Sequence, residues 1–198
     1  MRTLSSLTSF RQLTNDRIVT WNDFGEAHYV GPIYSDSEIP AGSAQFVDGF
    51  PHDAWRNFLP YYIAAYKGTP LAITTDQVQY WYRDTPAAAG SACSVTGNIA
   101  SQDQTEVDPN SIMEDGIFFS ALLVAAGDVT VQIGSSAVVS FAGVAGINHW
   151  SIPFAGRTGA PTFTVVRGGV TTASGTGLKD ITDGTGGCTN YNAFVGGF

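Results

Sequence analysis

Ten consecutive residues, Thr20 to Tyr29, hold the densest group of chemically capable side chains in the sequence. They read Thr-Trp-Asn-Asp-Phe-Gly-Glu-Ala-His-Tyr and include the carboxylates of Asp23 and Glu26 and the imidazole of His28. Only 13% of the chain is charged, so this concentration of polar groups needs an explanation. Two neighbouring carboxylates suit acid/base work, because one can supply a proton while the other stays ionised. We therefore take this stretch as the candidate site.

The two carboxylates are three residues apart at the end of a predicted strand. In a straight strand, residues at that spacing point to opposite faces of the sheet. Both can serve one site only if the backbone turns between them. Gly25 lies between them and permits such a turn, because it has no Cβ to restrict its dihedral angles.

The elements around this stretch resemble part of an α/β domain. Residues 4–16 repeat apolar positions every three and predict a short amphipathic helix, and residues 17–21 predict a short buried strand. Residues 31–51 are rich in Gly and Pro and predict a loop. Residues 53–67 have helical spacing, with His52 or Asp53 as the cap and Gly68 as the stop. Pro60 predicts a kink or break inside that helix.

The pattern changes near residue 70, where we place a domain boundary. Short apolar or alternating runs follow one another, separated by turn residues and without intervening helices. This pattern predicts an antiparallel β-sandwich of about seven or eight strands, with residues 84–112 as a long excursion. The predicted strands are 77–83, 117–126, 129–133, 138–141, 147–154, 162–167, 170–173 and 191–195.

The first 70 residues are too few for a closed α/β fold, since a (β/α)8 barrel needs roughly 250 residues. Two interpretations remain open from the residues alone. The chain is the C-terminal portion of a larger protein, or these residues pad the sandwich. The first residues lack the apolar core of a secretion signal. If the protein is exported, we expect the signal to lie upstream.

Composition narrows the choice of partner. The net charge is −8, with 17 acidic and 9 basic residues and no Lys/Arg cluster, so nucleic acid is not an expected partner. No apolar run approaches the roughly 18 residues of a membrane helix, so a membrane is not expected either. Cys93 and Cys188 allow a disulfide or two separate thiols. The acids from Asp103 to Asp115 lack the spacing of a calcium loop, and no metal site is expected.

Four segments resemble the C-terminal part of the fungal α-1,3-glucanases, or mutanases, of glycoside hydrolase family 71. They are residues 20–32, 49–67 (Gly-Phe-Pro-His-Asp-Ala-Trp-Arg-Asn-Phe-Leu-Pro and onward), 80–83 (Tyr-Trp-Tyr-Arg) and 189–196 (Thr-Asn-Tyr-Asn-Ala-Phe-Val-Gly). The resemblance implies a (β/α)8 barrel followed by a β-sandwich. Residues 1–70 would then be the last strand and helices of an incomplete barrel, and residues 71–198 the sandwich.

The resemblance also implies a function and a site. The family's catalytic Asp-x-x-Glu pair falls on Asp23 and Glu26, and the implied substrate is the α-1,3-glucan polysaccharide of fungal walls and bacterial biofilms. The implied location is extracellular or at the cell wall, and no cofactor is implied. The sequence departs from the family in lacking the earlier barrel elements, and in having Ala27 where a Ser is expected.

Glycoside hydrolysis assigns the two carboxyl groups different roles. We expect Glu26 to be the general acid and Asp23 the base or nucleophile. Trp21 and Tyr29 offer stacking faces for sugar rings, while Asn22 and His28 offer hydrogen bonds to hydroxyls. By contrast, Trp55, Trp81 and Trp150 are interpreted as packing residues, and His149 as a residue of a sandwich strand.

Three hypotheses follow. The first is an α-1,3-glucan hydrolase of which this chain is a part, in which case the chain alone is expected to be inactive because it lacks substrate positioning. The second is a non-catalytic polysaccharide-binding sandwich, and the third is a purely structural module. The sequence indicates no oligomeric state.

Overall fold

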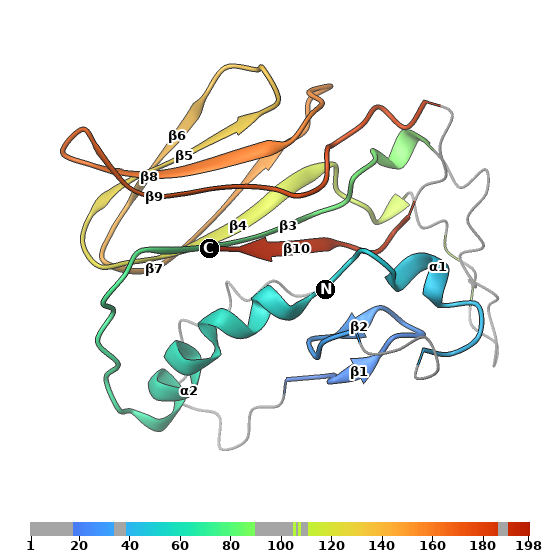
Figure 1. The fold of residues 1–198 in the computed structure, drawn as a ribbon, viewed down its shortest axis with the longest axis horizontal. Helices are drawn as coiled ribbons and strands as arrows, with labels where there is room; N and C mark the ends of the chain where they lie inside the picture. The colour runs from blue at the N-terminus through green and yellow to red at the C-terminus, as the bar shows by residue number, and fades with distance from the viewer. Residues whose placement is uncertain (1–17, 34–38, 90–104, 106, 108–110, 186–189) are drawn as a thin grey trace.

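Two antiparallel β-sheets form most of the computed structural model, which describes residues 18–33, 39–89, 105, 107, 111–185 and 190–198 (Figure 1). One sheet has the strand order β10-β3-β4-β7 and the other β6-β5-β8-β9. The strands are β3 (Gln77–Tyr82), β4 (Gly116–Leu123), β5 (Gly127–Ile133), β6 (Val139–Gly143), β7 (Gly146–Pro153), β8 (Pro161–Arg167), β9 (Val170–Thr176) and β10 (Phe194–Gly197). Each predicted strand overlaps one of them, so the β-rich prediction is confirmed.

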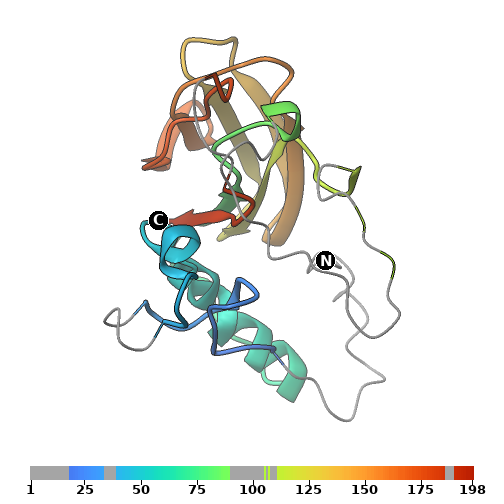
Figure 2. The same ribbon diagram turned by 90° about the vertical axis from the view of Figure 1, so that its right-hand side faces the viewer.

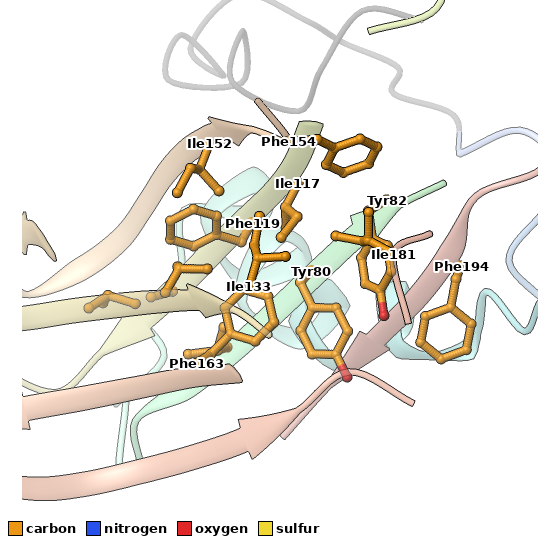
Figure 3. Close-up of a cluster of buried hydrophobic side chains, with 14 of the residues drawn as sticks. Tyr80, Tyr82, Ile117, Phe119, Ile133, Ile152, Phe154, Phe163, Ile181 and Phe194 are labelled. Atoms are coloured by element: carbon orange, nitrogen blue, oxygen red, sulfur yellow. The ribbon is translucent and has the colours of Figure 1, made fainter. Parts of the chain in front are cut away.

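The core lies between the two sheets (Figure 3). In β5 the alternate residues Val129, Val131 and Ile133 are fully buried, as expected for a strand with one face toward a core. Aromatic rings fill the space between the layers: Tyr80 stacks on Phe163 at 4.5 Å between ring centroids, and Phe119 lies 5.8 Å from Phe163. In β5 the alternation of apolar and polar residues therefore matches the alternation of buried and outward-facing positions.

The N-terminal part packs as a smaller layer against the outer side of the first sheet (Figure 2). It contains β1 (Asn22–Asp23), β2 (His28–Tyr29), α1 (Ala44–Val47), the 3-10 helix η3 (Asp53–Phe58) and α2 (Leu59–Lys67). Its own apolar cluster is small and is built on four buried residues: Phe24, Tyr29, Ile39 and Val47. A further short helix, η4 (Ala87–Ala89), lies in the predicted excursion.

The predicted helix over 53–67 is confirmed, including its interruption. The chain is a 3-10 helix up to Phe58, and α2 begins one residue before Pro60. Proline fits the first turn of a helix, where its missing N–H has no partner to lose. Gly68 ends α2 with a φ of 67°, the left-handed conformation that glycine adopts readily.

The predicted buried strand over 17–21 is wrong for the described residues 18–21. Ile18 and Val19 are 61% and 71% exposed, and regular strand structure begins only at Asn22. An apolar run becomes a buried strand only when neighbouring strands cover it. The described residues contain no closed barrel, and the barrel-fragment interpretation stays a prediction. The helix predicted over 4–16 and both cysteines lie outside the described residues.

The N-terminal layer contacts the sandwich through η3. Gln79 on β3 donates its side-chain N–H to the Ala54 carbonyl, and the Trp55 and Trp81 rings meet edge to face at 6.2 Å. These contacts support the interpretation of Trp55 and Trp81 as packing residues. Trp150 packs against Phe119, and His149 lies on β7 opposite Ser120, also as predicted.

Candidate functional site

A short hairpin carries the candidate acids. Its strands β1 and β2 pair Asn22 with Tyr29 and Asp23 with His28 in antiparallel register. The pairing extends outward, because Thr20 N–H donates to the His28 carbonyl and Val30 N–H donates to the Thr20 carbonyl. Asp23 and His28 therefore face each other across the hairpin, and Glu26 lies in the turn between them.

The sequence predicts the unusual backbone conformation of the turn at Gly25, but the structure has it at Ala27. Ala27 has a φ of 55°, whereas Gly25 has no positive φ. The Asp23 carboxylate accepts a hydrogen bond of 3.2 Å from the Glu26 N–H. Asp side chains commonly fix a turn in this way. The turn that brings the two acids together therefore depends on Asp23 and Ala27.

The three titratable side chains converge. One carboxylate oxygen each of Asp23 and Glu26 and one ring nitrogen of His28 lie within 4.8 Å of one another. The shortest contact joins His28 Nδ1 and Glu26 Oε2 at 3.4 Å. Glu26 and His28 are open to solvent, with side-chain exposure of 72% and 54%, and Asp23 is half-buried. Within the described residues this is the group whose donor set could hold a divalent cation.

Trp21 and Asn22 stand beside the acids on the outer surface. Trp21 is 50% exposed, and Asn22 is exposed as well. The Arg56 guanidinium lies 5.4 Å from the centroid of the Trp21 ring, and it also pairs with Asp53 at 3.0 Å. The sequence reasoning missed Arg56, because a basic residue on η3 has no pattern that places it against the hairpin.

Tyr29 and His52 lie on the buried side of the hairpin. Tyr29 is 1% exposed, and its hydroxyl donates to the Phe50 carbonyl. His52 occupies the predicted N-cap position of η3, but its side chain makes no capping hydrogen bond. Its ring stacks on Tyr29 instead, with 3.9 Å between the centroids.

Two hollows lie elsewhere on the described surface. One, of about 520 Å³, is lined by Asp53, Ala54, Arg56 and Asn57. The other, of about 290 Å³, lies between the start of η3 and the ends of β9 and β10. Neither is lined by Asp23 or Glu26. The acid pair lies outside both hollows, on a hairpin whose Glu26 and His28 are exposed.

Comparison with known proteins gives these acids a context. The sequence profile described as glycosyl hydrolase family 71 matches residues 12–198. The chain belongs to glycosyl hydrolase family 71. The match covers the hairpin, the N-terminal layer and the sandwich, so all three are family 71 structure.

Two fungal relatives resemble this family 71 chain. It is 40% identical over 182 residues to the glucan endo-1,3-alpha-glucosidase agn1 of Schizosaccharomyces pombe. It is also 40% identical over 184 residues to a mutanase of Penicillium rubens. Each match covers 90% of this chain but only 39% and 38% of the relatives. An ascus wall endo-1,3-alpha-glucanase of S. pombe is 24% identical over 193 residues.

No solved structure matches the chain. Among the residues that the structure describes, none of the helices has the length and apolar character needed to cross a bilayer.

Proposed function

We propose that this chain supplies the acid pair of a glycoside hydrolase that cleaves α-1,3-glucan. The observation that carries the proposal is the convergence of Asp23 and Glu26 on one exposed hairpin in a family 71 chain. The two relatives at 40% identity are named as a glucan endo-1,3-alpha-glucosidase and a mutanase, which supports the substrate.

The two acids take different roles in this proposal. Glu26 donates a proton to the leaving glycosidic oxygen, and Asp23 acts as the base or nucleophile. Asp23 suits a role that demands a fixed position, because the Glu26 N–H holds its carboxylate. Glu26 extends into solvent beside His28, where it can reach a bound glucan. Trp21 offers its half-exposed ring as a stacking face, and Asn22 and His28 offer hydrogen bonds. Tyr29, the other predicted stacking residue, is 1% exposed and is not part of this proposal.

The proposal includes a larger enzyme, because the hairpin alone does not enclose a substrate. Neither hollow contains the acid pair, and α2 has no buried residue. Ile18 and Val19 are exposed although they are apolar. We infer that residues 1–70 are the last strand and helices of a (β/α)8 barrel and that residues 71–198 are its companion sandwich. The part of each relative that this chain does not match is long enough to contain the other strands and helices of such a barrel.

The proposed location is outside the cell or at the cell wall, where the enzyme would have access to α-1,3-glucan. The name of the ascus wall relative supports a wall-directed role. The proposed partner is the polysaccharide alone, without nucleic acid or membrane.

A chimera tests the proposal. In it, this chain replaces the matched region of the P. rubens mutanase, and release of reducing sugar from α-1,3-glucan is measured. Asp23→Asn and Glu26→Gln should each lower kcat by roughly 100-fold or more, because acid/base catalysis contributes that much. Asp128→Asn removes an exposed acid of β5 and serves as the matched control. Full activity of both hairpin variants would refute the assignment.

The 198-residue chain by itself should release little or no reducing sugar, because substrate positioning supplies much of the barrier reduction. The competing candidate is a polysaccharide-binding module without catalysis, which the half-exposed Trp21 favours. An active chimera that becomes inactive with Asp23→Asn would exclude it. A chimera that binds insoluble glucan without hydrolysis would favour it.

A further inference from the structure

We propose that Tyr29, His52 and Asn192 are positioning residues that fix the hairpin of Asp23 and Glu26 to the β-sandwich. The inference rests on the proposed function for its catalytic meaning. It makes the sandwich part of the catalytic machinery, which a loosely tethered binding module would not be.

Tyr29 is the anchor on the hairpin side. Tyr29 directly follows His28, and His28 pairs with Asp23 across the hairpin. Its hydroxyl donates to the Phe50 carbonyl at 2.5 Å and accepts from Asn192 Nδ2 at 2.8 Å. Burial raises the pKa of Tyr29 to about 12, so the phenol keeps the proton that it donates. Movement of Tyr29 would therefore move β2 and, through the pairing of the hairpin, Asp23 on β1 and Glu26 in the turn.

His52 connects the hairpin to the edge of the first sheet. Its Nδ1 lies 2.8 Å from the Tyr29 carbonyl, and its Nε2 lies 3.0 Å from the Ala193 carbonyl. Ala193 directly precedes β10, which pairs with β3 in the sandwich. The ring is 1% exposed and stacks on Tyr29 with an interplanar angle of 4°. One side chain thus touches both the hairpin and the sandwich.

Asn192 completes the connection from the sandwich side. It is 5% exposed, and its Nδ2 contacts the Phe46 carbonyl at 3.1 Å as well as the Tyr29 hydroxyl. Asn190 also donates to the Phe46 carbonyl, at 2.8 Å. The segment before β10 therefore holds both β2 and the end of α1. Hydrogen bonds within a buried polar cluster of this kind favour one arrangement of the elements they join.

Amide hydrogen exchange on the 198-residue chain tests the inference directly. Asn192→Leu removes both donated bonds at similar side-chain size, and Phe46 keeps its bond from Asn190. We expect amides of residues 20–31 to exchange about tenfold faster or more, while those of β4, β5 and β8 stay unchanged. Asn148→Leu is the matched control, because Asn148 makes its bonds within the β6–β7 turn.

Kinetics in the chimera separate positioning from simple stabilisation. Asn192→Leu should lower kcat while KM stays near the unaltered value, because substrate still binds but the acids are misplaced. Tyr29→Phe keeps the ring and removes only the hydroxyl, so it provides a second variant if Asn192→Leu does not fold. Unchanged hairpin exchange, equal loosening of hairpin and sandwich, or an unchanged kcat would each overturn the inference. A chimera inactive without any substitution would count against the proposed function, and the exchange data would still decide the positioning role.

Discussion

Residue type alone predicts a left-handed backbone at Gly25 and an ordinary one at Ala27, and the structure has the reverse. The left-handed conformation falls on Ala27, which has a Cβ, while Gly25 adopts a backbone open to other residues. A Cβ on Gly25 would meet nothing closer than Asp23 Oδ1 at 3.9 Å. The glycine that the hairpin needs is Gly31, where a Cβ would lie 2.6 Å from the Trp21 carbonyl oxygen.

A pair of alanine substitutions tests this difference. Gly25→Ala should leave the free energy of unfolding unchanged or raise it by up to about 1 kcal/mol, because alanine restricts the unfolded chain. Gly31→Ala should lower it by about 1–3 kcal/mol, because the backbone of Trp21 must move. Urea unfolding of both variants is the measurement. Equal destabilisation by the two would contradict the assignment.

At the scale of elements, Asp76 joins four strands near one end of the sandwich. It precedes β3 and accepts hydrogen bonds from Arg167 at the end of β8, Thr172 on β9 and the Val124 N–H after β4. Burial pushes the pKa of Asp76 up, but these bonds outweigh it and hold the pKa below its usual value of 3.8. The carboxylate is therefore ionised in the folded sandwich.

Asp76→Asn should lower the urea midpoint at neutral pH, because the substituted amide has no charge for Arg167. The sign with pH follows from the lowered pKa. The unfolded chain takes the proton first as the pH falls, so the stabilisation present above about pH 4 is lost below it. The difference between unaltered protein and variant should therefore shrink in acid. A difference that stays constant from pH 7 to pH 3 would contradict this account.

For the molecule as a whole, the two parts differ in the size of the apolar core that each has for folding. The sandwich has a large continuous core, while the separate apolar cluster of the N-terminal layer has only four buried residues, and the layer relies on η3 packing against β3 and β10. Small segments rarely bury enough apolar surface to fold alone. The N-terminal layer therefore depends on the sandwich more than the sandwich depends on it.

Residues 71–198 expressed alone should unfold cooperatively, with a lower midpoint than the full chain, because Gln79 and Trp81 lose their partners on η3. Residues 1–70 alone should show no cooperative transition. Thermal unfolding followed by circular dichroism compares the three proteins. Loss of cooperative unfolding in residues 71–198 would contradict a boundary near residue 70.

The sequence by itself determined most of the local elements and which acids are candidates for the site. Short apolar or alternating runs between turn residues located the sandwich strands, and Pro60 and Gly68 marked the break and the end of the helical segment, because these signals depend on neighbouring residues. The Asp-x-x-Glu spacing and the resemblance to family 71 came from the same local reading.

Only the tertiary structure decided what each buried face packs against. His52 contacts Tyr29 although the two are 23 residues apart in the sequence, and Asn192 contacts Tyr29 at a separation of 163 residues. The exposure of Ile18 and Val19 likewise depends on which strands are at hand to cover them. Periodicity reports that a face is buried, whereas its partner is set by long-range packing that no local pattern contains.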